Sequence, residues 1–203
     1  MSSTALPSFS GGVLAGGEGR RFGGQDKGWL LCGGRPFVEI ALDHLRPWAA
    51  DLRISANRNL ERYAALGLPV LGDRLGGGPL AGLLRLLETA TTPWLLSLPC
   101  DALSLPCNAL SLPERLFAEQ QRSGADIVVL QDDDGVHPTV SLTRTALAGD
   151  LERFLREAQR HSVRVWQARH RLARLRCEGV LSNVNDPGAL LRHEHALTES
   201  AHG

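Results

Sequence analysis

An α/β fold, in which a mainly parallel sheet lies between two layers of helices, is the architecture that the sequence predicts. Two observations indicate it. Short apolar runs that suit buried strands alternate with amphipathic helical segments along the 203 residues, and this order produces parallel sheets. The hydrophobic fraction of 43% is also enough for one core, so we expect residues 1–203 to form a single domain. Residues 1–8 and 194–203 are expected to be disordered tails.

The expected strands are short and apolar, and several end directly before glycine or aspartate. The first precedes a glycine-rich stretch, and the strand at 94–98 is the most apolar. In chain order the expected strands cover residues 13–15, 52–56, 69–71, 94–98, 126–130, 139–142 and 172–177, with a short extended piece at 29–31. Asp132–Gly135 is expected to be a hairpin turn whose three acids are solvated, because Asp-Gly commonly closes turns.

The expected helices carry apolar side chains on one face and have recognisable ends. The clearest has leucines at the spacing of a single helical face: Leu80, Leu83, Leu84 and Leu87. Pro79, just before them, suits the first turn of a helix, and Gly67 closes another expected helix. In chain order the expected helices cover residues 36–46, 60–66, 79 onward, 113–122, 147–160, 162–170 and 187 onward.

Composition and charge argue against several classes of protein. Basic and acidic residues number 22 each, so the formal net charge is zero and indicates no surface for nucleic acid or an anionic membrane. None of the 4 cysteines forms a C-x-x-C pair, so free thiols in a reducing cytoplasm are expected. Residues 1–10 lack the basic and apolar regions of a signal peptide, and no apolar run is long enough to span a membrane. We therefore expect a cytoplasmic protein.

The glycine-rich stretch after the first expected strand is the most informative part of the chain. Residues 16–27 contain five glycines, two arginines and one lysine. Glycines at this density let backbone N–H groups approach a ligand closely, and successive amides that face one way bind anions. The Walker pattern is absent because Lys27 is followed by glycine, and a dinucleotide fingerprint is absent because Phe22 stands where its third glycine belongs. We interpret the stretch as a polyphosphate-binding loop of another kind.

Two aspartates also follow expected strands. Asp73 and Asp101 lie just past the strands at 69–71 and 94–98, and the carboxyl ends of parallel strands form the edge where ligands bind. Asp101 suits a Mg²⁺ ligand, because this ion takes one or two carboxylates and fills its shell with waters and substrate phosphates. Lys27 and Arg21 stay cationic at neutral pH and suit the phosphates themselves. No catalytic triad or paired-carboxylate motif is found.

Five short motifs extend this pattern over nearly the whole chain: Leu14–Gly28, Gly78–Gly82, Pro99–Asp101, His137–Thr139 and Asn183–Asn185. In this order they resemble the motifs of the molybdenum cofactor guanylyltransferases, which belong to the sugar-nucleotide-type nucleotidyltransferases. The resemblance implies a three-layer, Rossmann-like fold of the nucleotide-diphospho-sugar transferase type.

The resemblance also implies a reaction. The terminal phosphate of molybdopterin, with or without molybdenum, attacks the α-phosphorus of GTP in a reaction with Mg²⁺ as cofactor. Pyrophosphate leaves, and molybdopterin guanine dinucleotide forms. A phosphate monoester is mostly dianionic at pH 7, so this nucleophile needs no general base.

The resemblance further assigns roles to particular residues of this sequence. The implied catalytic residues are Arg21, Lys27 and Asp101, with Asp101 as the metal ligand. The implied nucleotide-binding residues are Leu14, Ala15, Gly16, Gly17, Lys27, Asn57, Asp73 and Asp101. The implied pterin-binding residues are His137, Asn183 and Asn185, of which the two asparagines share a side if the chain is extended there. GTP and molybdopterin or the molybdenum cofactor are the implied partners, with molybdoenzymes or their chaperones as recipients of the product.

One departure from the family pattern leaves the nucleotide open. Relatives carry Asn-x-Asn at the end of the second strand, whereas this chain reads Ser55-Ala56-Asn57. Serine forms hydrogen bonds but lacks the two-group amide that suits a purine edge. A sister enzyme that uses CTP or a sugar 1-phosphate therefore remains an alternative. A non-catalytic carrier of the pterin, which would bind it without releasing pyrophosphate, is an alternative of another class.

Overall fold

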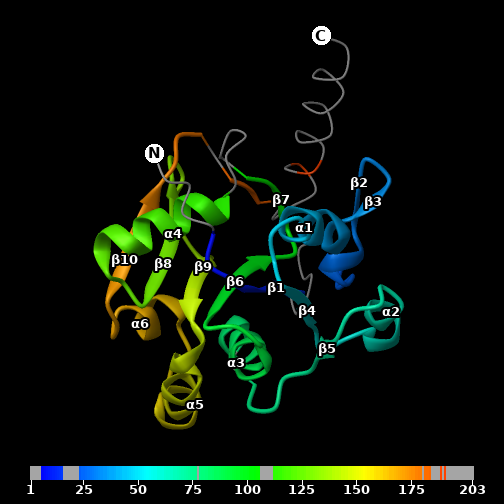
Figure 1. Ribbon diagram of the computed structural model, residues 1–203. Coiled ribbons are helices and arrows are strands. Elements are labelled where there is room, and N and C mark those ends of the chain that lie inside the picture. Colours follow the sequence, from blue (N-terminus) through cyan, green and yellow to red (C-terminus); the bar gives the residue numbers. More distant parts are fainter. Residues whose placement is uncertain are drawn as a thin grey trace.

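The computed structural model describes residues 6–15, 23–76, 78–105, 112–179, 181–183, 188 and 190. Within them a central sheet of seven strands has the order β10-β8-β9-β6-β1-β4-β5 (Figure 1). Its strands are β1 (Ser10–Leu14), β4 (Asp51–Ser55), β5 (Val70–Leu71), β6 (Trp94–Pro99), β8 (Ile127–Asp132), β9 (Gly135–Arg144) and β10 (Leu172–Arg176). Strand β9 runs antiparallel to both neighbours, and the other described pairs are parallel. The mainly parallel sheet is confirmed.

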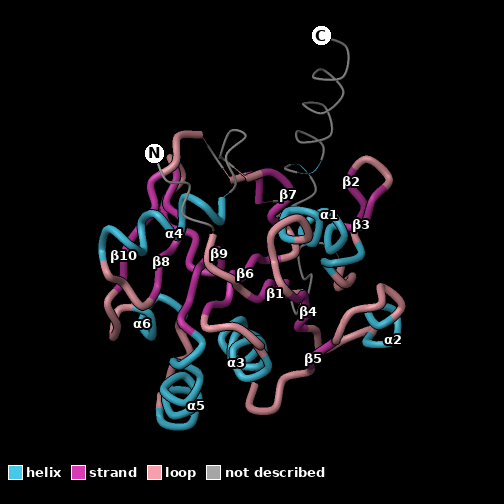
Figure 2. Tube along the Cα trace, viewed as in Figure 1, coloured by secondary structure: helices cyan, strands magenta, loops and turns pink. Residues whose placement is uncertain are grey.

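Helices cover both faces of this sheet, as Figures 1 and 2 show. The helices are α1 (Phe37–Leu45), α2 (Leu60–Ala64), α3 (Pro79–Thr89), α4 (Leu112–Ser123), α5 (Ala148–Glu157) and α6 (Val163–Gln167). Buried side chains of α1 and α4 belong to one apolar cluster, and those of α3, α5 and α6 belong to a second. The sheet thus separates two cores, which confirms the three-layer α/β architecture.

Smaller elements join the helices and strands of the central sheet. A hairpin is formed by β2 (Leu31–Cys32) and β3 (Arg35–Pro36), and β7 (Ala102–Ser104) pairs with β11 (Ser182–Asn183). Two short 3₁₀ helices are η2 (Lys27–Trp29) and η3 (Thr145–Leu147). The extended piece expected at 29–31 is therefore wrong at Trp29. The Asp26 carboxylate accepts the Gly28 N–H, and the Asp26 carbonyl accepts the Trp29 N–H, so the chain coils at this point.

The hairpin turn after β8 differs from its expectation in one residue. The turn at 132–135 is present, but Asp132 is buried rather than solvated. Its carboxylate accepts backbone N–H groups from Asp134 at 2.9 Å, Gly135 at 3.0 Å and Leu181 at 2.6 Å. These donors replace water, which explains the burial.

Some expectations at the two ends of the chain fall where little is described. Residues 6–8 have no regular structure, whereas residues 1–5 and 194–203 lie outside the described residues. The helix expected from Pro187 also lies almost entirely outside them.

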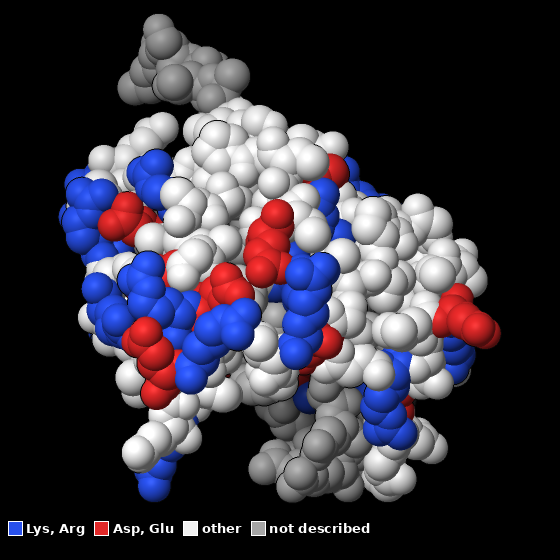
Figure 3. All heavy atoms as spheres, turned by 90° about the horizontal axis from the view of Figure 1, so that it is seen from below, with Lys and Arg blue, Asp and Glu red and all other residues white. Residues whose placement is uncertain are grey.

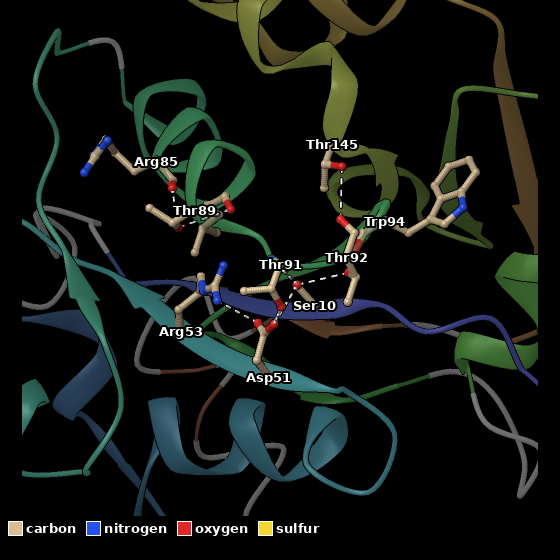
Figure 4. A network of polar contacts seen from close by, with 10 residues as sticks. Ser10, Asp51, Arg53, Arg85, Thr89, Thr91, Thr92, Trp94 and Thr145 are labelled. Carbon is tan, nitrogen blue, oxygen red and sulfur yellow. Dashed lines mark hydrogen bonds and ion pairs between the residues drawn. The ribbon is translucent and has the colours of Figure 1, made fainter.

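A polar network ties together the amino ends of the central strands (Figure 4). Ser10 at the start of β1 donates to Asp51 of β4 and shares a hydrogen bond with Thr92, each at 3.0 Å. Asp51 also accepts from the Thr91 hydroxyl and pairs with the buried Arg53 at 2.8 Å. This end of the sheet is thus fixed by side-chain contacts, while the carboxyl end carries the candidate site.

Candidate active site

Four neighbouring strands deliver the predicted site segments to one edge of the sheet. Past the end of β1, the Ala15 N–H donates to the Ser55 carbonyl at 2.8 Å, and the Cys100 N–H donates to the Leu14 carbonyl at 3.0 Å. On the next strand, the Ala56 N–H donates to the Leu71 carbonyl at 3.0 Å. The glycine-rich loop, Asn57, Asp73 and Asp101 all follow these paired ends directly. The expectation that separate parts of the chain meet at one edge is confirmed.

Lys27 and Asp101 form an ion pair at this edge. The Lys27 ammonium hydrogen-bonds to the Asp101 carboxylate, although the two residues are 74 positions apart in the sequence. Their side chains are only 16% and 11% exposed, so water screens the two charges little. The structure therefore brings one cation and one carboxylate into contact beside the end of β1.

Asn57 and Asp73 form a second pair, through two reciprocal hydrogen bonds. The Asn57 side-chain amide donates to the Asp73 carboxylate at 2.6 Å, and the Asp73 backbone N–H donates to the Asn57 side-chain oxygen at 2.8 Å. The second carboxylate oxygen of Asp73, Oδ1, is buried and has no hydrogen-bond partner among the described residues. A buried acceptor of this kind is costly unless a ligand satisfies it.

A comparison with known families decides the relationship. The sequence profile of the MobA-like NTP transferase domain matches residues 11–186, a span that contains both pairs and all four strand ends.

The chain belongs to the MobA-like NTP transferase family.

Individual relatives agree with this assignment. The molybdenum cofactor guanylyltransferase of Pasteurella multocida is 38% identical over 168 residues, which cover 82% of this chain and 87% of that protein. The molybdopterin-guanine dinucleotide biosynthesis protein A of Archaeoglobus fulgidus has a TM-score of 0.73 at 20% identity, over 94% of this chain and 99% of that one. A Mycobacterium tuberculosis protein crystallised with manganese has a TM-score of 0.66 at 18% identity, over 92% and 98%. These two structures share the fold with the present chain.

The side chains of this MobA-like domain that could bind a metal fit a divalent ion whose remaining ligands are phosphates and waters. Among the described residues, no group of three or more His, Cys, Asp or Glu side chains could hold a metal. Burial, followed by the neighbouring Asp101, raises the pKa of the Cys100 thiol, which therefore offers no thiolate at neutral pH. One carboxylate remains at the Lys27 site, and a hard ion such as Mg²⁺ suits it because phosphates and waters complete its shell.

Ser55 lies inside the protein, against helix α3. Its side chain is buried and faces helix α3, where a Cβ added to Gly82 would stand only 2.6 Å from the Ser55 hydroxyl oxygen. The residue that departs from the family pattern thus fills the space between β4 and α3. Asn57, the residue that keeps the family pattern, holds Asp73 instead.

The predicted pterin-side residues are placed only in part. His137 lies in β9 with its Nε2 2.7 Å from the buried carboxylate of Asp132, so it takes part in the hairpin. Asn183 is opposite Ala102 in the β11–β7 register, which puts its backbone beside the residue that follows Asp101. Their contact with a pterin stays a prediction. Gly16, Gly17, Arg21 and Asn185 lie outside the described residues.

Sequence reasoning missed two residues that contact the loop. Asp26 was grouped with the motif but given no role, and Tyr63 was not singled out. The Tyr63 hydroxyl donates to the Asp26 carboxylate at 2.7 Å. An Asp before Lys-Gly could have been read as a turn cap, whereas nothing in the spacing of Tyr63 indicates its partner.

Proposed function

We propose that this MobA-like transferase transfers GMP from GTP to molybdopterin or the molybdenum cofactor, forming molybdopterin guanine dinucleotide and releasing pyrophosphate. The observation that carries the proposal is the Lys27–Asp101 pair at the carboxyl edge of the sheet, beside the start of the glycine-rich loop. The 38% identity to a molybdenum cofactor guanylyltransferase over 82% of the chain supports the choice of substrates.

In this proposal Lys27 binds the triphosphate and Asp101 holds Mg²⁺. The ion, when bound, neutralises phosphate charge, which is the electrostatic help that phosphoryl chemistry needs most. Lys27 has two anionic partners available, the Asp101 carboxylate and the phosphates, so its ammonium can shift between them without crossing the site. Arg21 and the amides of Gly16 and Gly17 would add further positive potential around the leaving pyrophosphate.

Asn57 and Asp73 form the nucleoside side of the proposed site. The unpartnered Asp73 Oδ1 is an acceptor that an N–H or O–H group of the nucleoside would satisfy. The amide of Asn57 fixes the orientation of this carboxylate through its second oxygen, so the acceptor is preorganised before a ligand arrives. Asp73 is therefore proposed to orient the nucleoside, and Asn57 to orient Asp73.

The acceptor would enter from the side of β7 and β11. Asn183, and with it Asn185 and His137, are proposed to contact the pterin or its phosphate. The attacking phosphate is mostly dianionic at neutral pH, so positioning replaces a general base. We further propose that the reaction takes place in the cytoplasm, where the buried cysteines Cys32, Cys100 and Cys177 would stay reduced, and that molybdoenzymes or their chaperones receive the product.

Product formation tests the proposal directly. The protein is incubated with molybdopterin, Mg²⁺ and either GTP or CTP, and both the dinucleotide and pyrophosphate are quantified. We expect the guanine product with GTP, little product with CTP, and none when the metal is chelated or when Asp101→Ala is used. Preference for CTP would identify a cytidylyltransferase, and pterin binding without any pyrophosphate release would identify a carrier; either result overturns the proposal.

A further inference from the structure

We propose that Asp26 is a positioning residue, which Asn59 and Tyr63 hold in place so that Lys27 stays directed at Asp101. The inference rests on the proposed function, because it concerns how the same site keeps its cation in place. Asp26 itself would touch neither nucleotide nor metal. Its effect would pass through the single peptide bond that joins it to Lys27.

The Asp26 carboxylate connects the loop to the helix α2 region with both of its oxygens. Oδ1 accepts the Tyr63 hydroxyl at 2.7 Å and the Gly28 N–H at 3.2 Å. Oδ2 accepts the Asn59 side-chain amide at 2.9 Å. A carboxylate that is held from two directions cannot rotate freely, so the backbone on either side of Lys27 is fixed.

Tyr63 is a fixed donor rather than a mobile surface residue. Its side chain is fully buried, and its ring packs at 5.0 Å from the Trp29 ring, over which the Arg62 guanidinium lies at 4.0 Å. Burial, and then the hydrogen bond to Asp26, raise the pKa of the Tyr63 phenol far above its usual range. The hydroxyl therefore keeps its proton and donates to Asp26 throughout the working pH range.

Gly28 shows how closely the loop is drawn onto this phenol. A Cβ added at Gly28 would stand only 2.3 Å from the Tyr63 hydroxyl oxygen. Any larger residue would push the loop away from α2 and displace Lys27, its immediate neighbour. Position 28 therefore requires glycine because the Tyr63 hydroxyl is so close, and not because of its backbone conformation.

The segment before α2 links the two halves of the proposed site. Asn57 binds Asp73 on the nucleoside side, the Arg58 guanidinium donates to the Gly24 carbonyl at 3.1 Å, and Asn59 binds Asp26. Three consecutive side chains therefore contact the nucleoside side and the phosphate loop together. A lysine side chain loses conformational entropy when it becomes ordered. Because the backbone beside Lys27 is already fixed, less conformational entropy is lost when a ligand binds.

A double-mutant cycle tests the inference. We expect Asp26→Ala to lower kcat by about 10–100-fold and also to weaken GTP binding, though by less than Lys27→Ala does, since small misplacements of a catalytic group are costly. Tyr63→Phe, which removes one donor, should give a smaller loss of about tenfold or less. In a Lys27→Ala background, Asp26→Ala should change kcat by less than about twofold, because its effect requires the lysine.

Matched controls separate positioning from folding. Asp26→Asn keeps the volume and one acceptor oxygen, so it should recover part of the lost kcat. Glu61→Gln, an exposed change on the same helix, should leave kcat unchanged. Losses from Asp26→Ala and Lys27→Ala that simply multiply in the double variant, or an Asp26→Ala variant with normal kcat, would overturn the inference.

A binding measurement keeps this inference distinguishable from the proposed function. GTP affinity is measured by calorimetry for wild type, Asp26→Ala, Lys27→Ala and the double variant, without any acceptor. If wild type forms no dinucleotide but the two affinity losses are non-additive, the proposed reaction is wrong and the positioning role stands. If product forms but the losses in affinity and in kcat are both additive, the positioning role is wrong and the reaction stands.

Discussion

Lys27 is the residue at which the chemistry of this site is concentrated. It is part-buried, paired with the Asp101 carboxylate, and part of the glycine-rich stretch at residues 16–27. In the proposed mechanism its charge is preorganised, so that little reorganisation is needed when negative charge develops on the phosphates. Loss of such a donor is more damaging than loss of an exposed charge, which water and salt largely screen.

Lys27→Ala is therefore expected to lower kcat by at least ~100-fold, the scale of one preorganised charge donor. The measurement is steady-state pyrophosphate release with molybdopterin, GTP and Mg²⁺. Asp43→Asn, which changes an exposed carboxylate paired with Arg35 on the surface, is the control and should keep wild-type activity. A loss of only two- or threefold in Lys27→Ala would remove Lys27 from the phosphate site.

At the scale of residues, the sequence identified the charged residues that lie in recognisable motifs. It did not identify the contacts that hold such residues in place. Lys27 and Asp101 follow from a glycine-rich loop and a strand end, because both patterns are local. Tyr63 and the burial of Asp132 depend on contacts 37 and 49 positions away, with Asp26 and Leu181. Periodicity and turn chemistry contain no information about such distant partners.

The β8–β9 hairpin holds the chain at residues 179–181, on the proposed acceptor side. Asp132 accepts the Leu181 N–H, and the Asp133 carboxylate accepts the Gly179 N–H at 3.0 Å. Directly after Leu181 the chain forms β11, which pairs with β7 next to Asp101. The hairpin thereby sets where the segment with Asn183 meets the site.

The free energy of unfolding at acid pH should depend on Asp132. Burial raises the pKa of this carboxyl, but the N–H of Leu181, then His137 and the N–H of Asp134, lower it by more, so the pKa lies below its usual value. The stabilisation is therefore complete above the unfolded value of about 3.9 and is lost as the pH falls through the folded pKa. At neutral pH, Asp132→Asn is expected to lower the free energy of unfolding by about 1–3 kcal/mol.

Urea unfolding of wild type and Asp132→Asn between pH 2 and pH 7 measures this contribution. The difference between the two proteins should be largest at neutral pH and should shrink below about pH 4, as the wild-type carboxyl is protonated. A difference that stays constant over the whole range would show that the ionised carboxylate is not what stabilises the hairpin.

The polar network at the amino ends of β1 and β4 should contribute to stability alone. Asp51→Ala leaves the Ser10 and Thr91 hydroxyls and the buried Arg53 without their acceptor, and a loss of about 1–3 kcal/mol is expected. This corresponds to a fall in Tm of about 2–4 °C for each kcal/mol in a chain of this size. Calorimetry measures Tm, and kcat of the folded variant should match wild type because the network lies at the opposite edge from Lys27. A lower kcat at unchanged Tm would contradict the claim that this network affects stability but not activity.

At the scale of elements, strong periodicity was a reliable guide and short irregular segments were not. The leucines from Leu80 to Leu87 predicted α3, and Pro79 begins it as expected. Of the extended piece expected at 29–31, Trp29 was misassigned because the Asp26 side chain, rather than an apolar pattern, decides the local backbone there. The returning strand is longer than expected, since β9 pairs with β6 and β8 on both sides and extends back to the turn.

The whole molecule combines a neutral surface with a locally charged site. The formal net charge is zero, and on the face shown in Figure 3 acidic and basic side chains are interspersed. Exposed ion pairs, such as Arg156 with Glu152 at 2.7 Å, also occur among the described residues. A polyanionic substrate would therefore be recognised by local charge at the edge of the sheet rather than by the field of the whole protein.

None of the helices in the described ranges is long and apolar enough to cross a bilayer. The α/β class could be predicted because strands and helices alternate along the chain. The same alternation predicts that the carboxyl ends of the parallel strands lie at one edge of the sheet. The antiparallel insertion of β9 between β8 and β6 could not be predicted, because strand order depends on packing between distant segments.

The most direct test of a shared ligand between Lys27 and Asp101 is a crystal structure with GTP and Mn²⁺, in which the anomalous signal locates the metal. We expect the manganese peak within coordination distance of the Asp101 carboxylate and of the nucleotide phosphates, with the Lys27 ammonium in contact with those phosphates. A metal bound away from Asp101, or a triphosphate that Lys27 does not touch, would contradict the proposed site.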